Sequence, residues 1–181
     1  MVTLSEFSHE LKISELGGKM RSIHLSADAS QRAALAKRFD LAALDRLDAD
    51  LTMTTERSDI FATGELNAVL AQTCVATGEP VPVTVSEAVT IRFIPEPRIN
   101  EEAEFELAEE DCDVMFHDGQ LIDLGEAVAQ SLGLALDPYP RSPNADALLK
   151  SAGVKGEDEA GPFGVLASLK EKLEKKMMRD V

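Results

Sequence analysis

The sequence has few aromatic residues, few cysteines and few basic side chains, and each shortage excludes a class of protein. It contains no Trp and one Tyr, so its core must be built mainly from aliphatic side chains. Its two cysteines, Cys74 and Cys112, are too few for a disulfide framework, and we expect both to be free thiols. No apolar run approaches a membrane span, and the first residues lack the pattern of a targeting signal. We therefore expect a cytoplasmic protein without a membrane partner.

The charge balance constrains the partners further. The formal net charge is −15, from 33 acidic and 18 basic side chains in 181 residues. Nucleic-acid affinity comes largely from Lys and Arg contacts to phosphate. A surface this acidic therefore disfavours the binding of polyanions. Between Glu96 and Glu126 the only Lys or Arg is Arg98, among these acidic residues: Glu101, Glu102, Glu104, Glu106, Glu109, Glu110, Asp111, Asp113, Asp118 and Asp123. Two interpretations stay open, a solvated loop and an acidic arm for a basic partner.

The middle of the chain predicts an antiparallel sheet. Apolar and polar residues alternate from Leu47 to Met53, and again after a turn near residues 57–59. A third run places these side chains on one face: Val81, Val83, Val85, Val89, Ile91 and Phe93. Consecutive alternating runs with short turns favour a curved, barrel-like antiparallel sheet, with a bulge or sharp bend at Gly64.

Flanking helices are expected before and after these strands in the sequence. For the first helix, Ser26 is the predicted N-cap and Asp28 lies in the first turn. Leu35 and Phe39 are expected to pack inward, while Arg38 reaches water. An edge strand is expected at residues 7–13, before this helix.

A second helix is expected from Asp123, its N-cap, to Gly133, with Glu126 at the capping-box position. The expected class is thus α+β, with a single domain over residues 1–150 that includes an acidic arm at about 96–118. A flexible linker follows at 151–161, and an amphipathic C-terminal helix at 162–181.

Four segments, in this order, resemble one known family. They are Thr73–Pro82, Ile122–Leu124, Leu134–Arg141 and Pro162–Lys170. In order and spacing they are similar to the YceD-like family, the large-ribosomal-RNA accumulation proteins of bacteria and plastids. The resemblance covers most of the chain, from about Phe7 to the last helix. It implies a non-enzymatic role in ribosome assembly that supports accumulation of large-subunit ribosomal RNA.

The resemblance and the charge together suggest a monomeric protein that binds a basic large-subunit ribosomal protein or a pre-ribosomal particle. Three groups of residues are the candidate partner-binding site: the turn residues Cys74, Thr77, Glu79 and Pro80, the acidic residues Glu101, Glu102, Glu104 and Glu106, and the helix residues Phe163, Leu166 and Leu169. The C-terminal helix could insert into a partner's groove or fold back on its own sheet, and the sequence permits both.

No metal, cofactor or catalytic residue is expected. In many relatives the first turn carries two cysteines spaced for a metal, whereas here Thr77 stands at the second position. One thiolate cannot make a structural zinc site, which needs about four ligands, so Cys74 is expected to be a small buried apolar group. His117, Asp118 and Gly119 could suggest acid–base chemistry, but a polar turn is the simpler interpretation.

Two other functions stay open. In the first, an RNA-binding module acts directly on ribosomal RNA through a basic surface on the first helix, with a further patch at residues 170–179. The converging residues would be Arg21, Arg32, Lys37, Arg38 and Arg46. In the second, a metal-dependent enzyme uses Cys112 and His117 of the acidic arm.

Overall fold

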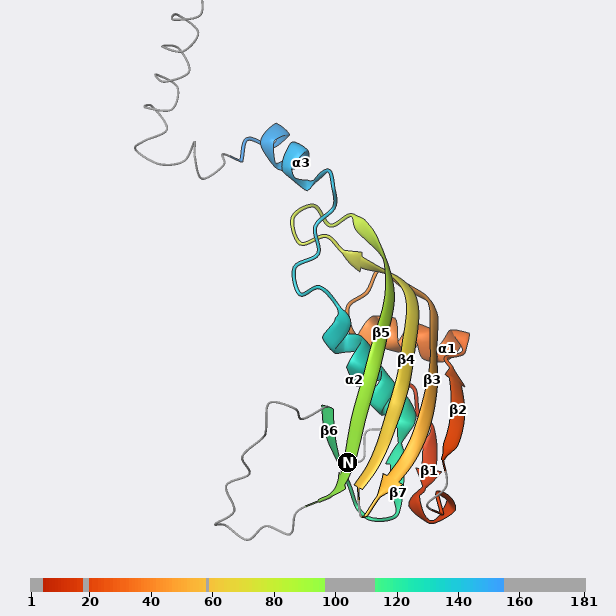
Figure 1. Ribbon diagram of the computed structural model, residues 1–181. Helices are drawn as coiled ribbons and strands as arrows, with labels where there is room; N and C mark the ends of the chain where they lie inside the picture. Colours follow the sequence, from red (N-terminus) through yellow and green to blue (C-terminus); the bar gives the residue numbers. More distant parts are fainter. Residues whose placement is uncertain (1–4, 18–19, 58, 97–112, 155–181) are drawn as a thin grey trace, which may run out of the picture. The chain divides into compact units, whose positions relative to one another are not determined.

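A computed structural model describes residues 5–17, 20–57, 59–96 and 113–154, and this part of the chain has an α+β fold (Figure 1). Its main sheet has the strand order β2-β3-β4-β5-β6. Neighbouring strands are antiparallel except β5 and β6, which are parallel. The strands are β2 (Arg21–Ser26), β3 (Ala43–Glu56), β4 (Asp59–Thr73), β5 (Pro80–Pro95) and β6 (Asp113–His117). Because β2 and β6 are the two ends of this order, the sheet is open, and the expected barrel-like closure is not found.

The three long strands confirm the alternation in the sequence. On β4, Leu66, Ala68 and Leu70 are buried, and Ile91 and Phe93 of β5 lie on the same face. The expected bulge is not at Gly64, since the register of β3 and β4 shifts between residues 44 and 46. Position 64 instead leaves no room for a side chain, because a Cβ atom there would lie 1.9 Å from the backbone oxygen of Asp50.

Two helices, α1 (Ala29–Arg38) and α2 (Leu124–Ala135), cover one face of the sheet (Figure 1). The predicted N-cap of α1 is wrong. Asp28 accepts a hydrogen bond from the backbone N–H of Gln31, whose side chain accepts one in return, so this pair forms the capping box. Ser26 belongs to β2, where its hydroxyl donates to Asp48.

The second helix begins as predicted but is stabilised differently. Asp123 accepts from the backbone N–H of Glu126, which confirms the N-cap. The Glu126 side chain does not complete a capping box, because it binds residues outside the helix. The helix also continues two residues beyond Gly133.

The N-terminal segment pairs with the short strand that immediately precedes this helix. The expected edge strand at residues 7–13 is shorter: β1 (Glu10–Lys12) is followed by the 3-10 helix η1 (Ile13–Glu15). β1 pairs antiparallel with β7 (Leu121–Asp123) in a separate two-stranded sheet.

The described residues divide into two compact units. The first contains residues up to Thr73 together with Pro80–Pro138, and thus every strand named above and both long helices. The second contains Cys74–Glu79 and the residues from Tyr139 on, including the short helix α3 (Ala145–Ser151).

Five elements were not predicted: β2, β6, β7, α3 and η1. β6 occupies residues 113–117 of the expected acidic arm, so the end of that arm is a strand. The rest of the arm from residue 97, and the predicted helix at 162–181, lie outside the described residues.

Candidate functional site

Three of the four predicted turn residues, Cys74, Thr77 and Glu79, belong to a hydrogen-bonded cluster in the second unit. Backbone hydrogen bonds of Cys74 close the turn. Its N–H donates to the backbone oxygen of Glu79 at 2.8 Å, and its backbone oxygen accepts from the N–H of Gly78 at 2.9 Å. The backbone N–H of Ser142 donates to the Cys74 sulfur at 3.3 Å. The Ser142 hydroxyl donates to the Glu79 carboxylate at 3.2 Å, so two segments distant in sequence meet at this sulfur.

These contacts change the chemistry of Cys74. The side chain is 2 % exposed, as expected, yet its sulfur is a hydrogen-bond acceptor and so is not a purely apolar group. A hydrogen bond from the Thr77 side chain, followed by one from the Ser142 backbone, lowers the pKa of Cys74 to about 6. Hydrogen bonds to the charged form of an acid stabilise that form, so the cluster favours a thiolate at neutral pH.

The donor set around Cys74 does not fit a structural metal. Thr77 occupies the place of a possible second thiolate and supplies a hydroxyl group instead. Structural zinc needs about four thiolate, imidazole or carboxylate ligands. No group of three or more potential metal-binding side chains is found in the described part of the chain.

The other predicted binding residues are only partly placed. Pro80 begins β5 and belongs to the first unit, while Cys74, Thr77 and Glu79 belong to the second. These remaining candidates lie outside the described residues: Glu101, Glu102, Glu104, Glu106, Phe163, Leu166 and Leu169.

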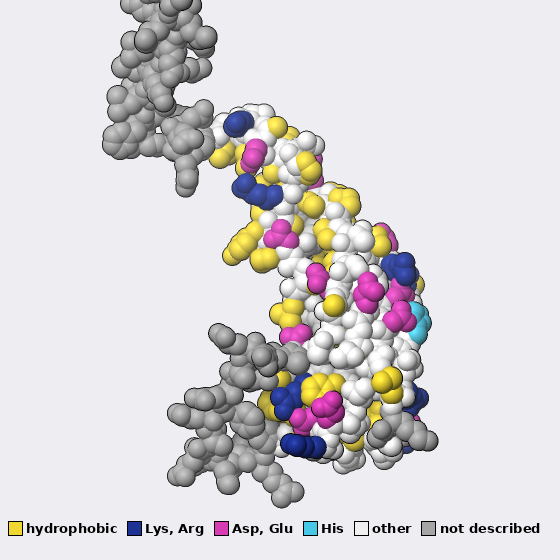
Figure 2. Space-filling view, viewed as in Figure 1, with side chains coloured by type: hydrophobic (Ala, Val, Ile, Leu, Met, Phe, Trp, Pro, Cys, Tyr) yellow, Lys and Arg dark blue, Asp and Glu magenta, His cyan; other side chains and the backbone are white. Residues whose placement is uncertain are grey.

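The sheet face opposite the helices carries a second group of acidic side chains, which the site prediction missed (Figure 2). Neither α1 nor α2 covers this face, since both pack against the other one. Asp50 stands opposite Glu65 on the neighbouring strand, and Asp48 points to the same face two residues away. The sequence signal was the alternation of apolar and polar residues in β3. It places Asp48 and Asp50 on one face of the strand and the buried residues on the other face.

Each of these carboxylates has a local partner. Asp50 lies 2.7 Å from Nδ1 of His24, and Glu65 accepts from the Ser86 hydroxyl at 2.7 Å. Asp48 accepts from the Ser26 hydroxyl at 2.6 Å and from Arg46. The Ser26 bond, followed by that of Arg46, lowers the pKa of Asp48, so this face stays negatively charged at neutral pH.

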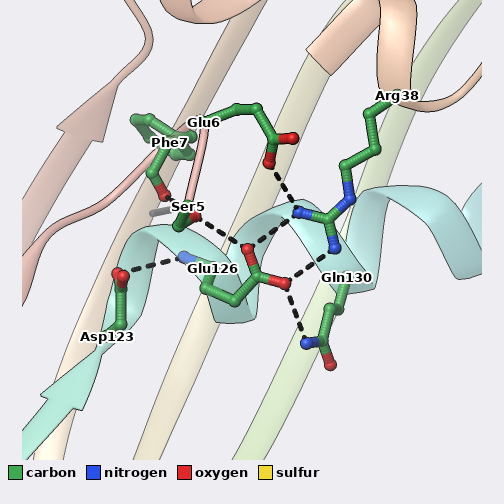
Figure 3. Close-up of polar contacts among 7 residues, drawn as sticks. All are labelled: Ser5, Glu6, Phe7, Arg38, Asp123, Glu126 and Gln130. Carbon is green, nitrogen blue, oxygen red and sulfur yellow. Dashed lines mark hydrogen bonds and ion pairs between the residues drawn. The ribbon is translucent and has the colours of Figure 1, made fainter. Parts of the chain in front are cut away.

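A third polar cluster joins α1, α2 and the N-terminal segment (Figure 3). The Arg38 guanidinium donates to both oxygens of Glu126, at 2.8 and 2.7 Å, and to Glu6 at 3.1 Å. Ser5 and Gln130 donate to the same Glu126 carboxylate, at 2.7 and 3.0 Å. Arg38 was expected to reach water, but it connects the two helices.

Charge and hydrogen bonding in this cluster act in the same direction. Hydrogen bonds, above all from Arg38, lower the pKa of Glu126 to about 2, and bonding to Glu126 raises the pKa of Arg38. All these residues bind one another within the first unit, so the cluster is a structural connection between elements.

The expected basic surface on the first helix is not assembled. Arg21 and Arg46 lie on β2 and β3, and Arg46 binds Asp48. On α1, Arg32 donates to the backbone oxygen of Ala27. Because Arg38 is also bound to carboxylates, most of these side chains are engaged inside the molecule.

The predicted polar turn at His117 is confirmed. Nδ1 of His117 accepts from the N–H of Gly119 at 3.0 Å, while the Asp118 carboxylate accepts from the N–H groups of Gln120 and Leu121. These backbone bonds lower the pKa of Asp118. His117 is 8 % exposed, so imidazole and carboxylate act as parts of the turn and present no open acid–base pair.

Fold and surface together define a class: an acidic α+β protein with an open sheet, two long helices on one face and a polar face that neither of these helices covers. A family model described as "Large ribosomal RNA subunit accumulation protein YceD" matches residues 62–170, which is more than half of the chain. The chain belongs to the YceD family, which confirms the resemblance seen in the sequence. The family's name indicates a role in accumulation of the large ribosomal RNA subunit.

The other comparisons add no relative. Neither a curated protein nor a solved structure matches the chain. Among the helices of the described residues, none combines the length and apolar character needed to cross a membrane.

Proposed function

We propose that the protein acts in the cytoplasm as a non-enzymatic ribosome-biogenesis factor that holds a basic protein of the large subunit, and thereby supports accumulation of large-subunit ribosomal RNA. Membership of the YceD family supports the ribosomal role. The uncovered face carrying Asp48, Asp50 and Glu65 supports the class of partner, because it attracts cationic groups.

The same charges argue against bare RNA as the main partner. RNA would have to approach a chain of net charge −15, and counterion release from phosphates requires accessible Lys and Arg side chains. Arg38 and Arg46 are already bound to carboxylates. The negative electrostatic field of the protein attracts a basic ribosomal protein and repels a polyanion.

A depletion experiment tests the ribosomal role. We expect a selective deficit of large subunits in sedimentation profiles when the protein is depleted, with restoration by the full chain. Unchanged profiles would overturn the assembly role.

A retention experiment tests the class of partner. The full chain is immobilised and incubated with total protein extracted from purified large subunits, and separately with the purified large-subunit RNA. We expect salt-sensitive retention of one or a few basic proteins, and little RNA. Retention of RNA alone would contradict the proposal.

Charge variants locate the contact on the uncovered face. Replacing all three acidic residues, D48N/D50N/E65Q, should weaken retention at low salt. The matched control, E10Q/E15Q/E87Q, removes the same charge from elsewhere in the first unit and should retain more protein than the test variant. Equal losses would show that only net charge matters.

A further inference from the structure

β6 ends the main sheet and leaves one strand edge unpaired within the described residues. It pairs with β5 on one side only, and no strand of the described part of the chain lies on its other side (Figure 1). An open edge presents backbone donors and acceptors that can pair with a further strand.

The ladder identifies which backbone groups face outward. The oxygen of His117 accepts from the N–H of Glu96, at the end of β5, so the backbone groups of His117 point toward β5. Backbone groups of successive residues in a strand point alternately to either side. The N–H and C=O groups of Val114 and Phe116 therefore point away from β5, toward the open edge.

A groove runs under this edge, between β6 and α2. Its volume is about 120 Å³, and its lining comprises Ile91, Asp113, Val114, Met115, Ala127, Gln130, Ser131 and Leu134. The four helix residues are spaced as one face of α2. An engineered apolar cavity of roughly 150 Å³ binds benzene, so the groove has room for about one apolar side chain.

Exposed apolar side chains flank the edge on both faces of the sheet. Leu134, at the groove, is 74 % exposed. Phe116 is 59 % exposed and lies beside Ile94 on the face opposite the helices. Successive side chains of an added strand point to opposite faces, so one strand would cover both residues.

The charges at this edge favour a basic occupant. Asp113 is the one charged residue of the groove lining, and Glu96 and Asp118 stand at the other end of β6. β6 itself contains no Lys or Arg.

We propose that an extended, basic segment of a partner protein adds as a strand to the open edge of β6, with one apolar side chain in the groove beside Leu134. This inference rests on the proposed function, which requires a basic ribosomal partner, and it specifies where and how that partner is held.

The test removes one outward N–H group. Proline lacks that group and is tolerated on edge strands whose N–H faces solvent, so Val114→Pro tests the edge directly. Val114→Ala loses the same side chain but keeps the N–H group. Thermal unfolding of both variants checks that the fold is intact, and retention is measured with the protein fraction from purified large subunits.

We expect Val114→Pro to weaken retention about tenfold relative to Val114→Ala. If wild type retains basic proteins and Val114→Pro retains them equally well, the edge proposal is wrong while the proposed function stands. If wild type retains none at low salt, the proposed function fails as well. A wild-type dimer that Val114→Pro makes monomeric would assign the edge to a second copy and overturn the proposal.

Cross-linking provides a measurement that does not depend on the proline variant. Photoreactive benzoylphenylalanine is placed at position 116 or 134, with position 20, which is 74 % exposed and precedes β2 at the other end of the strand order, as the matched exposed control. We expect both test positions to cross-link to one short basic segment of a large-subunit protein, and the control not to. Cross-links to residues 97–112 of the same chain would overturn the proposal.

Discussion

At Cys74 the surroundings of a single sulfur atom decide what the residue does. Thr77 and Ser142 donate hydrogen bonds to it from two separate segments. The sequence supported a buried residue, which the structure confirms, but it could not show the donors. Ser142 is 68 residues away, and only tertiary structure brings its N–H to the sulfur.

This environment predicts an unusual titration. In a Cys112→Ser background, the ultraviolet absorbance of the Cys74 thiolate should fade as the pH falls through about 6. Thr77→Val removes the largest cause and should raise the pKa, whereas Thr73→Val should leave it unchanged. A midpoint near the ordinary value of about 9.0 in wild type would contradict the assignment.

The same shift has a consequence for stability. The pKa of the folded state lies below that of the unfolded state, so the thiolate stabilises the fold fully above about pH 9. That contribution declines as the pH falls and is lost below about 6. We expect Cys74→Ala to make the unfolding free energy less dependent on pH between about 6 and 9. The measurement is denaturant unfolding in the Cys112→Ser background.

Among the elements, local sequence signals placed the long strands and α2 well. Alternation over β3, β4 and β5 is a strong signal because one face is buried along its whole length. β6 was missed because its five residues follow an acidic stretch and are too short for a clear period. Its cue was the apolar run Val114–Phe116.

The connection between α1 and α2 yields a prediction at this scale. Arg38→Met should destabilise the protein by roughly 1.5–3 kcal/mol, because it leaves the partly buried Glu126 carboxylate without its bidentate partner. The measurement is denaturant unfolding. Arg21→Met is the matched control: its ion pair with Glu15, at 4.0 Å, is exposed and should be worth less than about 1 kcal/mol.

The pKa of Glu126 determines how the stabilisation by the Arg38–Glu126 contact depends on pH. Its pKa of about 2 in the folded state lies below its ordinary value of 4.5. The stabilisation is therefore present above about pH 4.5 and declines as the pH falls toward 2. The difference in unfolding free energy between wild type and Glu126→Gln should shrink over this range. A constant difference would refute the charged contact.

The close approach of β3 and β4 gives a second prediction for an element. Gly64→Ala would place a methyl group against the backbone at Asp50, so the strands must separate. We expect a loss of roughly 3 kcal/mol in unfolding free energy. Thr63→Ala, at the neighbouring exposed position, should change it by no more than about 0.5 kcal/mol. A tolerated alanine at position 64 would show that the strands adjust there.

For the whole molecule, charge sets the expected response to salt. Attraction between an acidic surface and a basic partner is screened as ionic strength rises. We expect retention of large-subunit proteins to fall steeply between about 50 and 200 mM salt. The D48N/D50N/E65Q variant should show a shallower slope than wild type. Retention that does not respond to salt would indicate an apolar contact instead.

Composition and local pattern determined the acidic character, the α+β class, the three long strands, the Asp123 cap and the resemblance to a family, because each depends on residues near one another in the chain. Tertiary structure decided the open sheet, the Arg38–Glu126 connection, the donors at Cys74 and the edge of β6 with which no described strand pairs. These depend on which distant segments meet, and burial and strand pairing across long separations fix that outcome.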